Sequence, residues 1–276
     1  MSHGFFDYLK GEAEYSAEIL ELRKQEIAIC TKFWDFLDGE LIKSVDRNTI
    51  LFMYFKQQAT IALHLAISSI LRLHAFQSNQ NLRYALDCMA ICFYILQKNE
   101  ECNDIFLASK TDGFPEMTKK LKSKAFQLMV ANFSRLNEVF KTYKGYTNDY
   151  GAHVNLAVGG LTTSIMPDQK TMHVDFFDEL SQFFIGTQLL SISDIILGFI
   201  QIIIEHREDP KMLPLHDGVE EKLKRMQREL LDFKKKSLQW IQNAHKTAKK
   251  GDLCWCGSGK KFEECHEGKD LPYLKV

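Results

Sequence analysis

Proline and glycine-rich turns are scarce in this chain: only five prolines occur in 276 residues. Proline breaks helices and glycine favours turns, so their scarcity argues against folds built from many short strands and tight turns. Hydrophobic residues make up 45% of the chain, which is enough for a sizeable core that needs no metal. Long stretches of the chain carry apolar residues three and four positions apart. The sequence therefore predicts an all-α protein.

The sequence also lacks the features of a secreted protein. Its first residues, MSHGFFDYLKGEAEYS, are too polar and too acidic for a signal or transit peptide. Seven cysteines are an odd number, and without a secretory signal they are not expected to form a disulfide framework. Cys88 and Cys92 lie one helical turn apart in an apolar run, which is typical of buried small hydrophobic residues. We expect a cytoplasmic protein.

One apolar run is about long enough to span a membrane. Residues 183–204, FFIGTQLLSISDIILGFIQIII, include Asp194 near the centre and several hydroxyl and amide side chains. A lone carboxylate at that depth is costly in lipid. A buried central helix of a bundle explains the run better, so no membrane partner is expected.

The periodic pattern divides the chain into three parts. Residues 1–210 predict an α-helical bundle of about seven helices, with helices near 5–39, 46–76, 79–97, 100–110, 114–143, 148–158 and 176–207. A turn at Pro167-Asp168 between two β-prone runs predicts a small hairpin or a loop. Residues 215–250 predict an amphipathic connecting helix, and residues 252–268 hold a separate cysteine–histidine cluster.

The pattern of the connecting helix leaves two interpretations open. From Leu223 to Ala244, apolar residues step by three and four with polar residues between them. This spacing fits a short coiled-coil seam, which would pair two chains, and equally an amphipathic helix lying on the bundle. A homodimer is therefore one expectation.

Charge is unevenly distributed along the chain. Residues 219–276 hold 14 Lys/Arg against 9 Asp/Glu, a net charge of +5, whereas the remainder carries −6. A basic tail on an acidic body is either a solvated helix with a basic terminus or a surface for an anionic partner.

Four soft metal ligands lie within thirteen residues near the end of the chain, spaced C-x-C-x8-C-H: Cys254, Cys256, Cys265 and His266. Three thiolates and one imidazole suit Zn²⁺, which prefers four tetrahedral nitrogen and sulfur ligands. Gly257 and Gly259 are expected to take positive φ, so that backbone N–H groups point at the sulfurs. Phe262 is expected to pack under the site. A phosphate loop and a Cys/His nucleophile pair fit the spacing less well.

The segment CWCGSGKKFEECH resembles the SEC-C motif, the zinc-binding tail of the preprotein translocase motor SecA. Trp255 stands where that pattern often has proline, Glu263 where it has lysine, and Glu267 where it has glycine. None of these departures changes a ligand. The resemblance implies a structural zinc knuckle with an adaptor role, whose partner is a protein or the RNA and ribosome surface.

The helical body weakly resembles HEPN-like bundles, many of which are metal-independent ribonucleases. Those bundles carry an R-x4–6-H motif on a late helix, and Asn148 stands here in place of the arginine. Carried over, the resemblance implies that His153 is the general acid/base on an RNA 2′-hydroxyl. It further implies that Asp87 orients the histidine and that Arg83 holds the phosphate. A structural salt bridge between Arg83 and Asp87 is the other interpretation of that pair.

These observations lead to two hypotheses of different classes. The first is a zinc-binding helical protein whose SEC-C tail binds a protein or a nucleic acid. The alternative is a HEPN-like endoribonuclease of a bacterial stress or phage-defence type, with the SEC-C motif as a targeting tail.

Overall fold

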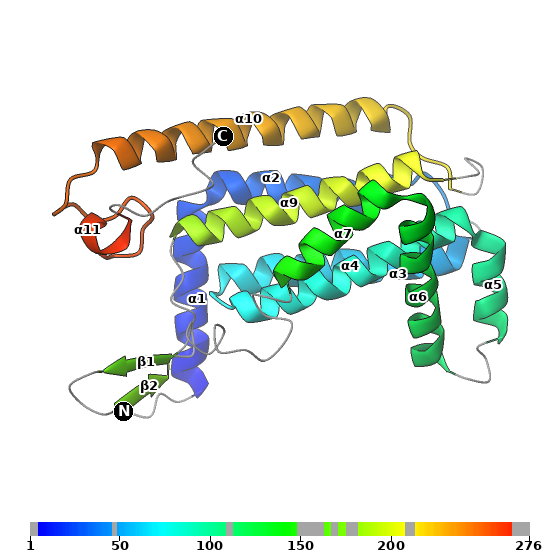
Figure 1. Ribbon diagram of the computed structural model, residues 1–276, viewed down its shortest axis with the longest axis horizontal. Coiled ribbons are helices and arrows are strands. Elements are labelled where there is room, and N and C mark those ends of the chain that lie inside the picture. Colours follow the sequence, from blue (N-terminus) through cyan, green and yellow to red (C-terminus); the bar gives the residue numbers. More distant parts are fainter. Residues whose placement is uncertain are drawn as a thin grey trace.

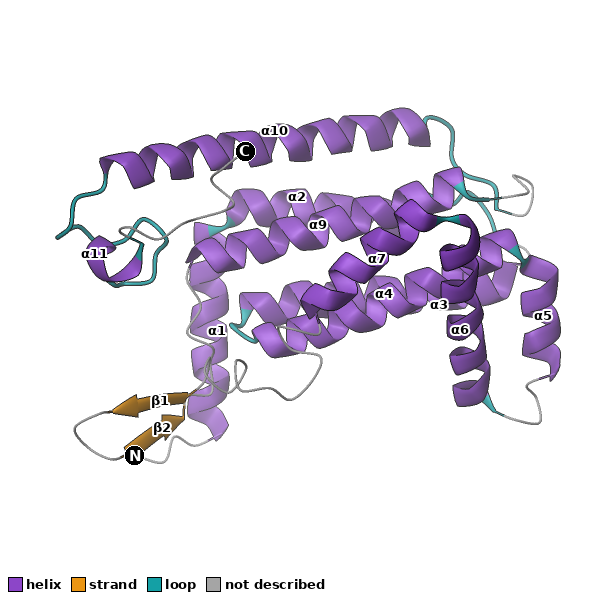
Figure 2. Cartoon of the chain, in the orientation of Figure 1, coloured by secondary structure: helices purple, strands orange, loops and turns teal. Residues whose placement is uncertain are grey.

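The computed structural model describes residues 5–45, 49–108, 113–147, 163–166, 171–174, 182–207 and 213–266. Within these ranges the chain forms ten α-helices, one π-helical turn and one two-stranded hairpin (Figure 1). The expected all-α class is confirmed, and Figure 2 shows how little of the described chain is strand. The elements are α1 (Phe5–Leu22), α2 (Lys24–Asp35), η1 (Phe36–Glu40), α3 (Ile50–Leu71), α4 (Ala75–Gln97), α5 (Asn99–Ala108), α6 (Phe114–Asn132), α7 (Ser134–Thr147), β1 (Thr163–Met166), β2 (Thr171–Val174), α9 (Gln182–Glu205), α10 (Val219–Thr247) and α11 (Phe262–Cys265).

The helix predicted for residues 5–39 is divided in two. Arg23 separates α1 from α2 because its backbone leaves the helical region, with φ −115° and ψ 25°. α1 consequently runs at a steep angle to α2 (Figure 1). The Arg23 guanidinium lies 3.1 Å from the Glu26 carboxylate, so the turn is closed by a local ion pair. No proline or glycine marks this break, and helical periodicity alone did not reveal it.

The helix predicted for residues 114–143 is divided as well, into α6 and α7. The break is Phe133, with φ −135° and ψ 56°. Its ring packs edge-on against the rings of Phe93 and His206, at centroid distances of 4.9 and 5.3 Å. Tertiary packing of one aromatic ring thus overrides the local preference for a continuous helix.

The turn between the next two helices lies earlier than predicted. α3 ends at Leu71 and α4 begins at Ala75, because the chain turns at Leu73, a non-glycine residue with φ 60°. Residues 46–48, the predicted start of α3, lie outside the described residues, and so does the helix predicted at 148–158.

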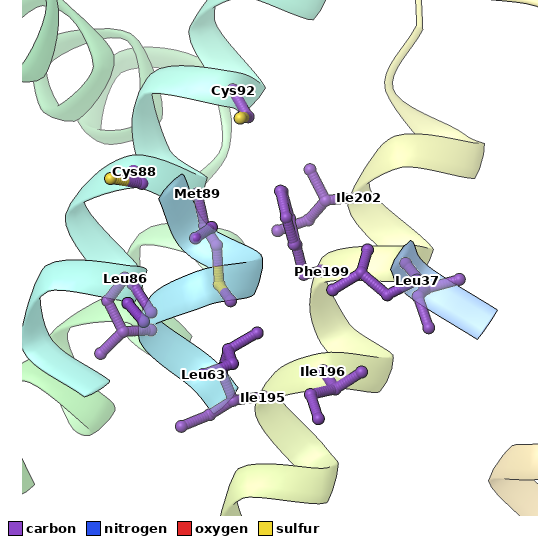
Figure 3. Packing of buried hydrophobic residues seen from close by; sticks show 14 of the residues in the cluster. Leu37, Leu63, Leu86, Cys88, Met89, Cys92, Ile195, Ile196, Phe199 and Ile202 are labelled. Carbon is purple, nitrogen blue, oxygen red and sulfur yellow. The ribbon is translucent and has the colours of Figure 1, made fainter. Parts of the chain in front are cut away.

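The core lies where α3, α4, α9 and α2 pack together. α3 and α4 are joined by a three-residue turn and make the most extensive helix pair. Figure 3 shows Met89 of α4 and Phe199 of α9 meeting across this core, with Leu63 of α3 and Leu37 of η1 beside them. All four side chains are at most 2% exposed. Each buried side chain of this kind contributes about 1.5–3 kcal/mol to folding, so the bundle needs no metal to form.

Two helices, α3 and α9, are long and apolar enough to cross a membrane by length and composition alone. Their most apolar windows are 56% and 61% buried inside the protein, as in the core helices of soluble proteins. Asp194, at the centre of α9, pairs with Lys234 of α10. This burial and pairing agree with the expected core helix at 183–204.

α10 lies along the bundle as an amphipathic helix, as expected (Figure 1). Its buried side chains are Val219, Leu223, Met226, Leu230 and Ile241. Three ion pairs also hold it to the body: Lys32–Glu229, Lys222–Glu40 and Lys234–Asp194. The first half of the apolar stripe packs on the same chain and is therefore not free to form a seam between two chains. The homodimer stays a prediction. The same is true of the division into parts at 1–210, 215–250 and 252–268.

The β-prone runs form the small hairpin that the sequence allowed. β1 and β2 pair antiparallel, with Thr163 opposite Val174 and Met166 opposite Thr171. The connecting residues 167–170 lie outside the described residues.

Lys56 of α3 supplies a test of the core. Its side chain is 1% exposed, and its Nζ donates a 2.9 Å hydrogen bond to the Asp38 carbonyl oxygen. Burial lowers the pKa of Lys56, and the nearby Asp38 carboxylate opposes that shift. The ammonium therefore connects α3 to η1 at a point that water does not reach.

Replacing Lys56 with alanine should lower the free energy of unfolding by about 2–3 kcal/mol. The change leaves a void along the buried stem and removes the donor from the Asp38 carbonyl. Urea denaturation followed by circular dichroism measures the loss. Lys10→Ala is the control, because the Lys10–Glu14 pair is exposed on α1 and should matter by less than about 0.5 kcal/mol. Equal losses in both variants would contradict this account.

Candidate metal centre

Backbone pairing after α10 brings the two halves of the cysteine–histidine cluster together. The Cys254 N–H donates to the Lys260 carbonyl oxygen, and the Phe262 N–H donates to the Asp252 carbonyl oxygen, each at 2.8 Å. Leu253 and Lys261 form an antiparallel bridge between these two bonds. The C-x-C segment thus lies beside the approach to α11, which carries Cys265 back to the first two cysteines.

The two glycines adopt the backbone conformation expected from the sequence. Gly257 has φ +73° and Gly259 has φ +71°, values that glycine accepts without steric cost. The Gly257 N–H donates to the Cys254 carbonyl oxygen at 3.1 Å. The backbone N–H of Cys256 hydrogen-bonds the Cys254 sulfur, as expected for amides that point at a thiolate.

The four predicted ligand atoms converge on one point. The sulfurs of Cys254, Cys256 and Cys265 and a ring nitrogen of His266 all lie within 4.8 Å of one another. Cys254 Sγ is 3.1 Å from His266 Nδ1, and Cys256 Sγ is 3.7 Å from Cys265 Sγ. Both cysteines of the C-x-C segment are buried. This cluster could hold one metal ion.

The electrostatics of the cluster favour a cation. Burial raises the pKa of the Cys254 thiol to about 12, and contacts with Cys256 and Cys265 add to the shift. Three thiolates this close repel one another unless a positive ion lies between them. Metal binding would therefore displace protons from the cluster and reverse the local preference for neutral thiols.

Aromatic rings surround the cluster. The Trp255 ring lies 4.7 Å from the His266 ring at an interplanar angle of 32°, and so covers a predicted ligand. Phe262 is 6% exposed and packs with Cys254 and Cys256 in a small apolar cluster, as expected. His245 of α10 contacts the Phe262 ring at a centroid distance of 5.2 Å. The cluster therefore has an apolar core of its own.

The same cluster contacts the first turn of α9. The sequence did not reveal this contact. The Phe183 N–H donates to the Cys256 carbonyl oxygen at 3.0 Å, so a predicted ligand residue satisfies one of the free amides at the start of α9. The rings of Phe183 and Trp255 meet edge-on at 5.6 Å. A Cβ atom on Gly257 would lie only 2.6 Å from the Cβ and Cγ atoms of Gln182. The contact is therefore close and directional.

The Arg83–Asp87 pair lies elsewhere, on α4, and joins three helices. The Asp87 carboxylate is 3.8 Å from Arg83, 3.1 Å from Lys122 of α6 and 3.2 Å from Lys144 of α7. Lys144 also lies over the Phe126 ring at 3.7 Å. Burial lowers the pKa of Lys144, and Asp87 opposes the shift. These contacts agree with the interpretation of Arg83 and Asp87 as a structural salt bridge.

The other two residues of the ribonuclease hypothesis, Asn148 and His153, lie outside the described residues. The hypothesis therefore stays a prediction.

Comparison with protein families bears on the metal cluster. Residues 252–268 match the SEC-C motif. The match covers the SEC-C module, as residues 252–268 are called from here on, and does not extend into the helical body. No match was found among curated proteins or among solved structures.

Gly257 and Gly259, the two glycines of positive φ in the SEC-C module, form a matched pair for testing the contact between the module and α9. Gly257→Ala and Gly259→Ala both place a side chain in the left-handed region, at a cost of about 1–2 kcal/mol each. Only the first meets Gln182, whereas a Cβ on Gly259 meets nothing within 4 Å. Gly257→Ala should therefore speed amide exchange at Phe183 and change tryptophan emission, and Gly259→Ala should not. Identical exchange in the two variants would disprove the contact.

Proposed function

We propose that this chain is a zinc-binding helical protein whose SEC-C module binds an anionic partner, a protein or a nucleic acid. The observation that carries the proposal is the convergence of three sulfurs and one imidazole nitrogen within 4.8 Å, in a segment that matches the SEC-C motif. Zn²⁺ would be held by Cys254, Cys256, Cys265 and His266.

The spacing of two of the sulfurs fits a zinc site. A tetrahedral ion with Zn–S bonds of about 2.3 Å has sulfur–sulfur edges of about 3.8 Å, and the Cys256 and Cys265 sulfurs are 3.7 Å apart. A set of four protein ligands leaves no position for a substrate. The zinc would therefore stabilise the module and would not act in catalysis.

The surface for a partner is the bridge that precedes α11. Lys249, Lys260 and Lys261 are exposed, and their ammonium groups form no ion pair among the described residues. The Asp252 carboxylate accepts a hydrogen bond from the Lys249 backbone N–H instead. Leu253, bridged to Lys261, is 74% exposed. Exposed cations around an apolar side chain suit phosphate groups or an acidic protein surface. Reduced thiols are needed at this site, which agrees with the proposed cytoplasmic location.

Metal analysis tests the zinc part of the proposal. Purified protein should contain about one zinc per chain by elemental mass spectrometry, since four ligands converge on one point. A variant with Cys254→Ser and Cys256→Ser should lose that zinc while most helical signal in circular dichroism remains, because the bundle has its own core. Cys88→Ser with Cys92→Ser is the control, since those thiols are buried in the bundle. Zinc retained without the two module cysteines would refute the ligand assignment.

The salt dependence of RNA binding tests the surface. Each contact with a single-strand phosphate contributes about 0.7 to the slope of log affinity against log salt. Lys260→Gln with Lys261→Gln should therefore reduce the slope for a mixed-sequence single-stranded RNA by about 1.4.

Lys235→Gln with Lys236→Gln makes the same charge change on the exposed face of α10 and should leave the slope unchanged. If both pairs reduce the slope equally, binding follows net charge, and the module surface is not the site.

A further inference from the structure

A cavity of about 870 Å³ lies between α7 and α10, with α9 as its floor. Figure 1 shows α7 and α10 on opposite sides of α9. This volume falls within the range typical of small-molecule sites. Ile195, Phe199 and Ile202 belong to the floor, and Figure 3 shows the same side chains packed in the core. The cavity lies away from the residues of the SEC-C module.

Three apolar features of this cavity are left uncovered. Gly198 lies in the middle of α9, and a Cβ atom there would meet nothing within 4 Å. Glycine weakens a helix interior relative to alanine, and no neighbour among the described residues requires it here. Val139 on the α7 wall is 46% exposed and Leu231 on the α10 wall is 51% exposed. An apolar occupant over Gly198 would remove both side chains from water.

The charged groups of the cavity lie toward its two ends. Asp194 lies toward one end and is already paired with Lys234. A hydrogen bond from Gln227 to Gln201 crosses the middle.

Arg135 and His206 lie toward the other end, where the His206 ring contacts Phe133 just before α7. Glu205 also lines this end and accepts a hydrogen bond from Gln201. Arg135 has no ion pair among the described residues, so its guanidinium is the cation that this end offers to an anion.

The length of the cavity suits an extended chain. Asp194 and His206 are twelve residues apart on α9, which corresponds to about 18 Å along the helix. A single extended hydrocarbon chain fits the length without exceeding the volume.

We propose that this cavity binds an anionic amphiphile of the fatty-carboxylate class. Its hydrocarbon chain lies over Gly198 between Val139 and Leu231, and its carboxylate meets Arg135 and His206. The Arg135 guanidinium at one end and the exposed apolar side chains of Val139 and Leu231 on the two walls favour this occupant.

Calorimetric titration of the full, delipidated chain tests the proposal. Dodecanoate, kept below its micelle concentration, should bind saturably at one per chain. Affinity should rise by up to about fourfold per methylene from octanoate to dodecanoate, as expected for buried CH₂ groups. Dodecanol, which has no charge, should bind at least tenfold more weakly. Absence of saturable dodecanoate binding would overturn the proposal, whether or not an amphipathic helical peptide titrated in parallel binds.

Variants locate the site. Gly198→Trp fills the space above the floor and should weaken dodecanoate binding at least tenfold, whereas Gly198→Ala should bind like the wild type and melt no lower. Arg135 is exposed, so Arg135→Gln should fold normally and reduce the preference for dodecanoate over dodecanol. That second variant decides the question if Gly198→Trp does not fold. Unchanged binding in a folded Gly198→Trp, or an unchanged preference in Arg135→Gln, would overturn the assignment.

Discussion

The structure of the SEC-C module depends on one constraint, which is that four potential ligand atoms lie within 4.8 Å of one another. Three of them are thiols, and burial raises the pKa of Cys254 to about 12, so neutral sulfurs are favoured until a cation arrives. A metal ion would convert this crowding into four bonds and would thereby hold the turn at Gly257 and the position of α11. The Trp255 ring would then pack against His266, a ligand whose position the metal ion already holds.

The SEC-C module contacts the helical body at the first turn of α9. The Cys256 carbonyl oxygen accepts a hydrogen bond from Phe183 at the start of α9, and Trp255 meets the Phe183 ring. α9 continues from this contact through the core and forms the floor of the cavity. α10 returns along the same helix, held by Lys234–Asp194. One long apolar helix thus connects the metal cluster, the core and the cavity, which gives the proposed partner surface a defined orientation on the bundle.

Sequence reasoning succeeded where short-range chemistry decides the structure. The ligand types and spacing of Cys254 to His266 predicted the cluster, and the need for positive φ predicted the roles of Gly257 and Gly259. It failed where distant packing decides: Phe133 ends α6 because its ring contacts Phe93 and His206. Likewise, the i, i+4 spacing revealed Arg83 beside Asp87, but Lys122 and Lys144 reach that carboxylate from other helices. Trp255, in a place where proline is common, was the one signal for the contact with α9.

The central claim is that three sulfurs and one imidazole nitrogen surround a single zinc ion. X-ray absorption at the zinc edge of the purified full chain tests it directly. The account predicts three sulfurs at about 2.3 Å and one nitrogen at about 2.0–2.1 Å. A first shell made of oxygen, or the absence of zinc together with a disulfide among Cys254, Cys256 and Cys265, would contradict it.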